Sequence, residues 1–188
     1  VVSSDRQKAF ILLGYAGTGK TSIIAALVQA YKELQQKIVL LAPTGRAAKV
    51  ISRYASTPAY TIHKYIYRHK QLGEAVFTLN DNLHKNTLFI VDEASMISGV
   101  RDNTMFGSGT LLDDLVKYVY SGEGCSMLLL GDDAQLPPVG SLISPALQSD
   151  YMQTYGLTVT CSILTDVPRQ AMDSGLLKYE RKICTGAV

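Results

Sequence analysis

The sequence has few cysteines and no long apolar run, and both shortages limit what the protein can be. Its three cysteines are Cys125, Cys161 and Cys184, and no two of them form a C-x-x-C pair. Neither a zinc site nor a disulfide framework is therefore indicated, and we expect a reduced, cytoplasmic setting. No apolar stretch approaches the roughly 18 residues of a membrane span, and no signal peptide is recognisable, so we expect no membrane partner.

Charge of one sign is not in large excess either. The 188 residues include 18 Lys and Arg against 16 Asp and Glu, which gives a formal charge of +2. This balance neither proves nor excludes a nucleic-acid partner, so any such site must be a local groove. The hydrophobic content of 47% is ordinary for a globular protein and argues against disorder.

The most informative stretch is the glycine-rich segment 14–21, Gly-Tyr-Ala-Gly-Thr-Gly-Lys-Thr. It follows the apolar run 9–13, which predicts a buried strand, and precedes residues 22–31, which predict a helix. Strand, glycine loop and helix form the context of a phosphate-binding P-loop, whose backbone N–H groups and helix N-terminus hold a polyphosphate. The predicted ATP-binding residues are Gly14, Ala16, Gly17, Thr18, Gly19, Lys20, Thr21 and Ser22. Lys20 would reach the β- and γ-phosphates, and the Thr21 hydroxyl would bind Mg²⁺.

Further apolar runs predict more buried strands at 37–42, 87–91 and 125–130. Their apolar residues are continuous rather than alternating, as expected when helices cover both faces of a parallel sheet. The segments between them have the composition or spacing of helices, notably 46–51 and 110–120. The sequence therefore predicts an α/β fold, a parallel sheet with helices on both faces.

Polar side chains follow two of these strands. Asp92 and Glu93 come directly after the run 87–91, so the strand would deliver two carboxylates at its carboxyl end. Beside a P-loop, Asp92 would lie near the Mg²⁺ opposite Thr21, and Glu93 could polarise a water in line with the γ-phosphate. Gln135 lies in the proline-containing loop after the strand 125–130. It is the side chain best placed there to sense a γ-phosphate, although alone it would be merely a loop amide.

Three other segments are ambiguous when read alone. Thr44 could cap a helix, and the tripeptide at 44–46 is equally well a plain strand-to-helix turn. A lone His63 is more often a structural residue than a functional one. Residues 67–82 predict a small β-hairpin projecting from the main sheet, either a solvated surface feature or a wedge.

Taken together, the motifs resemble those of the superfamily 1B DNA helicases, in the RecD-like branch, and the resemblance spans nearly the whole chain. Six motifs follow one another in order, at residues 14–21, 42–48, 61–63, 91–96, 131–139 and 169–170. The resemblance implies a RecA-like P-loop NTPase domain that uses ATP and Mg²⁺. It also implies that the strand ending at Gly131 lies between the P-loop strand and the Asp92 strand.

The resemblance further implies roles for individual residues. Lys20, Glu93, Gln135 and Arg169 match catalytic positions: the phosphate-binding lysine, the general base, the γ-phosphate sensor and an arginine reaching the γ-phosphate from the join with a second motor domain. Asp92 and Thr21 match the metal ligands. The residues that match a single-stranded DNA path are Thr44, Gly45, Arg46, Thr61 and His63. The hairpin then resembles a strand-separating pin, with Phe77 as a stacking side chain.

Such helicases need two RecA-like domains, and the sequence matches one. We expect motor domain 1 at residues 1–165, with the hairpin inserted at 67–82, and the truncated start of the second domain at 166–188. The chain would then be a piece of a longer helicase, lacking a segment that contacts adenine and weakly active or inactive alone. The rival functions are a P-loop ATPase that remodels protein and a nucleotide-binding module without catalysis.

Overall fold

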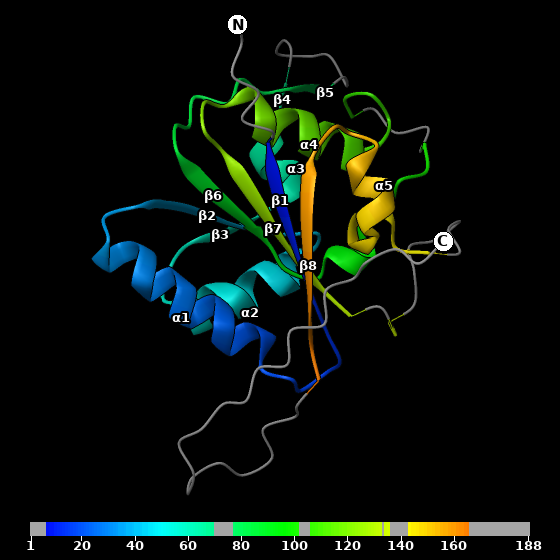
Figure 1. Ribbon diagram of the computed structural model, residues 1–188. Coiled ribbons are helices and arrows are strands. Elements are labelled where there is room, and N and C mark those ends of the chain that lie inside the picture. The colour runs from blue at the N-terminus through cyan, green and yellow to red at the C-terminus, as the bar shows by residue number, and fades with distance from the viewer. Residues whose placement is uncertain (1–6, 70–76, 102–105, 133, 136–142, 166–188) are drawn as a thin grey trace, which may run out of the picture.

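Six parallel strands form the central sheet of the computed structural model, which describes residues 7–69, 77–101, 106–132, 134–135 and 143–165 (Figure 1). Across the sheet the strands run in the order β3-β2-β6-β7-β1-β8. Their bounds are β1 (Lys8–Gly14), β2 (Lys37–Ala42), β3 (Ala59–Thr61), β6 (Thr87–Val91), β7 (Ser126–Gly131) and β8 (Thr158–Leu164). β7 thus lies between β1 and β6, as the resemblance implied.

Helices cover both faces of this sheet, so the predicted α/β class is confirmed. The helices are α1 (Lys20–Glu33), α2 (Gly45–Ala55), α3 (Ile62–Ile66), α4 (Leu111–Ser121) and α5 (Ser149–Gln153), with 3₁₀ turns η1 (Ala94–Met96) and η2 (Pro145–Leu147). Successive strand residues point to opposite faces. Leu40 and Ile90 accordingly pack in one cluster with residues of α1 and α2, whereas Leu41 and Val91 pack in another with residues of α3 and α4.

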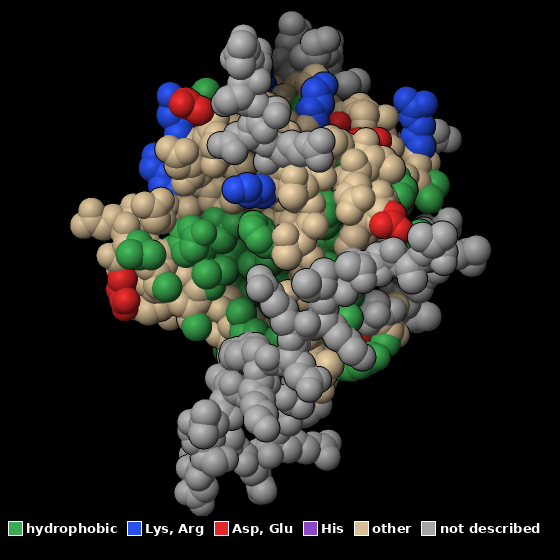
Figure 2. All heavy atoms as spheres, viewed as in Figure 1, with side chains coloured by type: hydrophobic (Ala, Val, Ile, Leu, Met, Phe, Trp, Pro, Cys, Tyr) green, Lys and Arg blue, Asp and Glu red, His purple; other side chains and the backbone are tan. Residues whose placement is uncertain are grey.

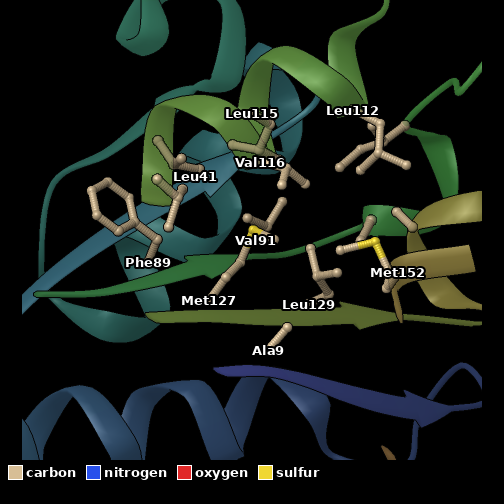
Figure 3. Packing of buried hydrophobic residues seen from close by; sticks show 14 of the residues in the cluster. Ala9, Leu41, Phe89, Val91, Leu112, Leu115, Val116, Met127, Leu129 and Met152 are labelled. Atoms are coloured by element: carbon tan, nitrogen blue, oxygen red, sulfur yellow. The ribbon is translucent and has the colours of Figure 1, made fainter. Parts of the chain in front are cut away.

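The larger cluster shows why continuous apolar runs form the inner strands. All five residues of β6 are buried. Figure 3 shows Phe89 and Val91 of β6, with Met127 and Leu129 of β7, on the side of the sheet that faces α4. Burying a side chain of this size stabilises the fold by about 1.5–3 kcal/mol. The continuous apolar run therefore determines the position of β6, and with it the position of Asp92 and Glu93, which follow the strand.

The side of the sheet that carries α1 is only partly covered by the described helices. Phe10 of β1 is 41% exposed, and Thr158 and Thr160 of the neighbouring β8 are exposed on the same side. Figure 2 shows hydrophobic side chains gathered in the middle of the face in view. The prediction of helices on both faces therefore holds for β2, β6 and β7 more fully than for β1 and β8.

The predicted hairpin forms a second, two-stranded antiparallel sheet. β4 (Tyr67–His69) pairs with β5 (Phe77–Leu79), and Tyr67 lies opposite Leu79. The Tyr67 hydroxyl donates a buried hydrogen bond of 2.7 Å to the Asp114 carboxylate on α4, which ties the base of the hairpin to the main domain. Residues 70–76, the predicted turn, lie outside the described residues, as do residues 166–188, the predicted start of a second domain.

Two strands were not predicted, the three-residue β3 and the edge strand β8. β8 pairs with β1 along its whole length, from Thr158 opposite Lys8 to Leu164 opposite Gly14. None of the described helices is long and apolar enough to span a membrane.

Candidate functional site

The loop between β1 and α1 has the backbone of a phosphate cradle. Gly17 and Gly19 have φ angles of 84° and 85°, a left-handed conformation that favours glycine. Gly14 is required for a different reason, since a Cβ atom there would lie 2.5 Å from Oγ1 of Thr18. The Thr18 hydroxyl in turn donates a 2.8 Å hydrogen bond to the Tyr15 carbonyl, which closes the loop. The structure therefore explains why glycine stands at all three positions of the motif.

Lys20 begins α1 and folds back over this loop. Its Nζ donates hydrogen bonds to the carbonyls of Gly14 and, at 2.9 Å, Tyr15. The ammonium group is therefore held at the mouth of the loop, where the N-terminus of the 14-residue helix α1 also favours an anion. Ala16, Gly17 and Ser22 are exposed there, and Thr21 is partly buried. The structure thus brings the predicted ATP-binding residues together.

Asp92 leaves β6 at the same edge of the sheet. Its backbone N–H donates to the Leu41 carbonyl at 3.0 Å, and its Oδ1 accepts from the Glu93 N–H at 3.0 Å. Burial raises the pKa of the Asp92 carboxyl, whereas the Glu93 N–H and the Lys20 charge act to lower it. Asp92 and Lys20, predicted from separate motifs, therefore interact electrostatically across the β7 strand.

Glu93 occupies an unusual backbone position. Its φ angle of 53° is left-handed, which is uncommon for a residue with a side chain and costs of order 1–3 kcal/mol. Burial and the neighbouring Asp92 raise the pKa of its carboxyl, and Arg46 acts to lower it. A carboxyl with a raised pKa is better matched to accept a proton near neutral pH, as a general base must.

Gln135 is linked to the acidic loop by a residue that the sequence did not single out. The buried Ser95 hydroxyl, in η1, donates a 3.3 Å hydrogen bond to Oε1 of Gln135. Ser95 is within the matched motif 91–96, so its position two residues after Glu93 was the available signal. Arg169 lies outside the described residues, and its role stays a prediction.

The residues predicted to line a DNA path lie around the starts of two helices. Oγ1 of Thr44 accepts from the Ala47 N–H at 3.2 Å and caps α2, and Oγ1 of Thr61 accepts from the Lys64 N–H at 3.3 Å and caps α3. Thr44 and His63 line one pocket of about 240 Å³, together with residues that include Met96 and Phe106. Gly45 and Arg46 are exposed beside it.

Phe77, on the hairpin, is connected to His63 through Phe106, whose ring centroid lies 5.2 Å from that of His63. The Phe77 ring stacks on Phe106 with centroids 4.4 Å apart, and the His69 ring lies 4.1 Å from it. It is half-buried, so one part of the ring supports the hairpin and another part faces outward. A DNA-stacking role for Phe77 stays a prediction.

The donor set fits a magnesium ion held largely by a substrate. Within the described ranges no group of three or more His, Cys, Asp and Glu side chains is arranged to hold a metal. Thr21 and Asp92 offer hard oxygen atoms, and Mg²⁺ typically takes one or two carboxylates plus phosphate oxygens. Both residues are partly accessible.

A family model and several known proteins match this chain. The family described as AAA domain matches residues 1–187. The chain belongs to this family. It is 34% identical over 155 residues to the uncharacterized protein MJ1519 of Methanocaldococcus jannaschii, covering 75% of this chain and 12% of that protein. It is 31% identical over 135 residues to the ATP-dependent RecD2 DNA helicase of Deinococcus radiodurans, covering 69% and 16%.

A similar fold occurs in the crystal structure of the Pif1 helicase from Candida albicans, with a TM-score of 0.53 and 20% identity over 89% of this chain and 38% of that one. The chain therefore has the RecA-like fold of a superfamily 1 helicase domain. It spans only 12% and 34% of the length of two uncharacterized relatives, MJ1519 and protein R530 of Acanthamoeba polyphaga mimivirus.

Proposed function

We propose that this AAA domain is the ATP-hydrolysing part of a DNA helicase of the RecD-like branch. The observation that carries the proposal is the meeting of four loops, those after β1, β2, β6 and β7, at one edge of the sheet. Lys20 acts on Asp92, Arg46 acts on Glu93, and Ser95 is hydrogen-bonded to Gln135. Groups proposed for phosphate binding, proton transfer and DNA contact therefore already interact.

ATP would bind with its phosphates on the loop from Gly14 to Ser22. Lys20 would exchange its carbonyl partners for phosphate oxygens, to which an ammonium donates stronger, charge-assisted bonds. Thr21 and Asp92 would hold Mg²⁺, which neutralises phosphate charge when bound. Glu93 would accept a proton from the attacking water, and its strained backbone would hold the carboxylate in place. Arg169 would add positive charge from a second RecA-like domain of the same parent protein.

Single-stranded DNA would cross the edge of the sheet near α2 and α3. The exposed Arg46 would pair with a phosphate, and the backbone around Thr44, Gly45 and Thr61 would hold others without reading sequence. His63 would contact the strand from the pocket that it shares with Thr44, and Phe77 would stack on a base at the hairpin. Ser95 and Gln135 would connect the nucleotide to this path, so that hydrolysis drives movement along the strand in a cytoplasmic setting.

The decisive experiment is the ATPase rate of the intact parent protein with and without single-stranded DNA. We expect a rise with DNA that the Lys20→Ala variant abolishes. A DNA-independent rate that Lys20→Ala still abolishes would favour an ATPase that remodels protein. ATP binding without turnover under any condition would favour a nucleotide-binding module.

A further inference from the structure

The solvent-facing side of α2 has an unusual composition. Its exposed side chains are Arg46, Lys49, Val50, Arg53 and Tyr54, which we call the α2 ridge. Arg46, Lys49 and Arg53 follow the spacing i, i+3 and i+7, which places them along one side of a helix. Val50 and Tyr54 lie beside them and are 44% and 67% exposed. The opposite side packs on the sheet through Ala47, Ala48, Ile51 and Ala55.

Arg46 acts on the nearby Glu93, but no salt bridge in the described part of the chain involves Lys49 or Arg53. The helix contains no acidic residue, and the salt bridges there join Arg68 to Asp81 and Lys85 to Glu123, away from the ridge. Arg46 lies in the first turn, where the helix dipole disfavours a cation. A solvated helix face would ordinarily mix both signs of charge. The ridge is therefore arranged for an external anion rather than for the stability of α2.

The ridge also has the shape to hold a chain. A surface pocket of about 330 Å³ is lined by Arg46, Lys49, Val50 and Arg53. With a rise of about 1.5 Å per residue, the cations are about 4.5 and 6 Å apart along the helix axis. The exposed Tyr54 lies at the far end from Thr44. Cations in a row beside an exposed aromatic ring are the features with which proteins bind single-stranded nucleic acid.

We propose that the α2 ridge binds single-stranded DNA, continuing the path beyond Arg46, with Lys49 and Arg53 on successive phosphates and Tyr54 stacked on a base. This inference rests on the proposed function, because Arg46 belongs to both surfaces. It extends the contact with the strand by about 10 Å along α2. The ridge would then hold a longer strand than the loops at Thr44 and Thr61 can hold alone.

The test compares fluorescent oligonucleotides of two lengths. A strand of about 6 nucleotides occupies one site of ordinary size, whereas one of about 20 can also reach the ridge. The double variant Lys49→Glu, Arg53→Glu should weaken binding of the long strand by about tenfold or more and reduce its salt slope by about 2. It should leave the short strand unaffected. The matched control, Lys37→Glu with Lys117→Glu, reverses two exposed charges elsewhere.

Three results would overturn the proposal. If the double variant and its control bind the long strand with equal affinity, the ridge does not bind DNA. The proposed function is then unaffected. If the double variant keeps its DNA binding but loses binding to polyglutamate, titrated in parallel, the ridge belongs to an acidic protein partner. If the unaltered protein binds neither strand, this result contradicts the proposed function as well as the ridge. Tyr54→Ala should weaken binding to single-stranded DNA but not to a duplex. Tyr54→Phe, which keeps the aromatic ring, should bind the single strand as the unaltered protein does.

Discussion

The Ser95 hydroxyl donates a hydrogen bond to Oε1 of Gln135 at 3.3 Å, and so joins the loop after β6 to the loop after β7. The first loop carries Asp92 and Glu93, and the second lies next to β1 and its P-loop. Packed strands do not deform readily, so small movements are confined to the loops that follow them. A hydrogen bond between two such loops can transmit a movement of one loop to the other. This contact connects the loop that carries the proposed base to the proposed γ-phosphate sensor.

Replacing Ser95 by alanine should therefore weaken coupling more than ATP binding. One neutral hydrogen bond contributes about 1 kcal/mol, so DNA stimulation of the ATPase should fall about fivefold. The affinity for ATP should stay within a factor of about two, because Ser95 does not belong to the P-loop. The control is Ser121→Ala, since the Ser121 hydroxyl donates only to Tyr118 of its own helix. Equal stimulation in both variants would contradict a coupling role.

Glu93→Gln tests the general base. The amide keeps the size of the side chain but cannot accept the proton, so turnover should fall by about 10²–10⁴. ATP should still bind, since Lys20 and the loop are unchanged. Stopped-flow binding and steady-state hydrolysis separate the two effects. Glu123→Gln, which alters an exposed carboxylate paired with Lys85, is the matched control. Turnover that survives in Glu93→Gln would remove Glu93 as the base.

Arg46→Ala tests the DNA path. Because the guanidinium would meet a phosphate, its loss should weaken binding to all sequences alike and reduce the salt slope by about 1. Titrations of two unrelated oligonucleotides at several salt concentrations measure both quantities. Lys117→Ala removes an exposed charge from α4 and should change neither. A loss limited to one sequence would show that Arg46 reads bases.

Tyr67→Phe tests the attachment of the hairpin. The buried Asp114 carboxylate accepts one hydrogen bond from Tyr67 and another, at 2.9 Å, from the Ser108 N–H. Removing the hydroxyl leaves a buried oxygen with one donor fewer and should lower the free energy of unfolding by about 1–3 kcal/mol. Urea denaturation measures this loss. Tyr54→Phe, at an exposed tyrosine, should cost far less, and equal losses would argue against the contact.

The sequence predicts the core of the fold because continuous apolar runs can only be buried. β2, β6 and β7 lie within a residue of their predicted bounds for that reason. β8 was missed because it alternates apolar and polar residues at the sheet edge, Thr158-Val159-Thr160-Cys161-Ser162-Ile163, and no motif drew notice to it. The alternation itself was the available signal.

Some features of the candidate site can likewise be predicted from the sequence, and others cannot. Residues held directly by the loops, such as Lys20 and Asp92, follow from motif spacing and are brought together in the structure. The link from Ser95 to Gln135 joins residues 40 positions apart. The resemblance placed the two strands side by side, but no local pattern reveals which side chains of the loops that follow them contact each other. The α2 ridge could likewise be identified only from the structure, because the burial of each α2 residue defines which side of the helix is exposed.

Two histidines, His63 and His84, should make the stability of the fold depend on pH. Burial lowers the pKa of His63, and burial together with Lys37 lowers that of His84. Each histidine therefore binds a proton more readily in the unfolded chain, whose ordinary pKa is about 6.5. The free energy of unfolding should then fall as pH falls through about 6.5 toward the lower folded values. Urea denaturation at pH 7.5 and 5.5 measures the difference.

The double variant His63→Gln, His84→Gln should reduce this pH dependence, because it removes the groups whose protonation differs between the two states. An unchanged pH dependence would show that other groups cause it. The lowered pKa also bears on the DNA path, since His63 would be neutral at pH 7 beside Thr44. A neutral imidazole offers a hydrogen bond but no fixed charge, so the salt dependence of binding there should come from Arg46.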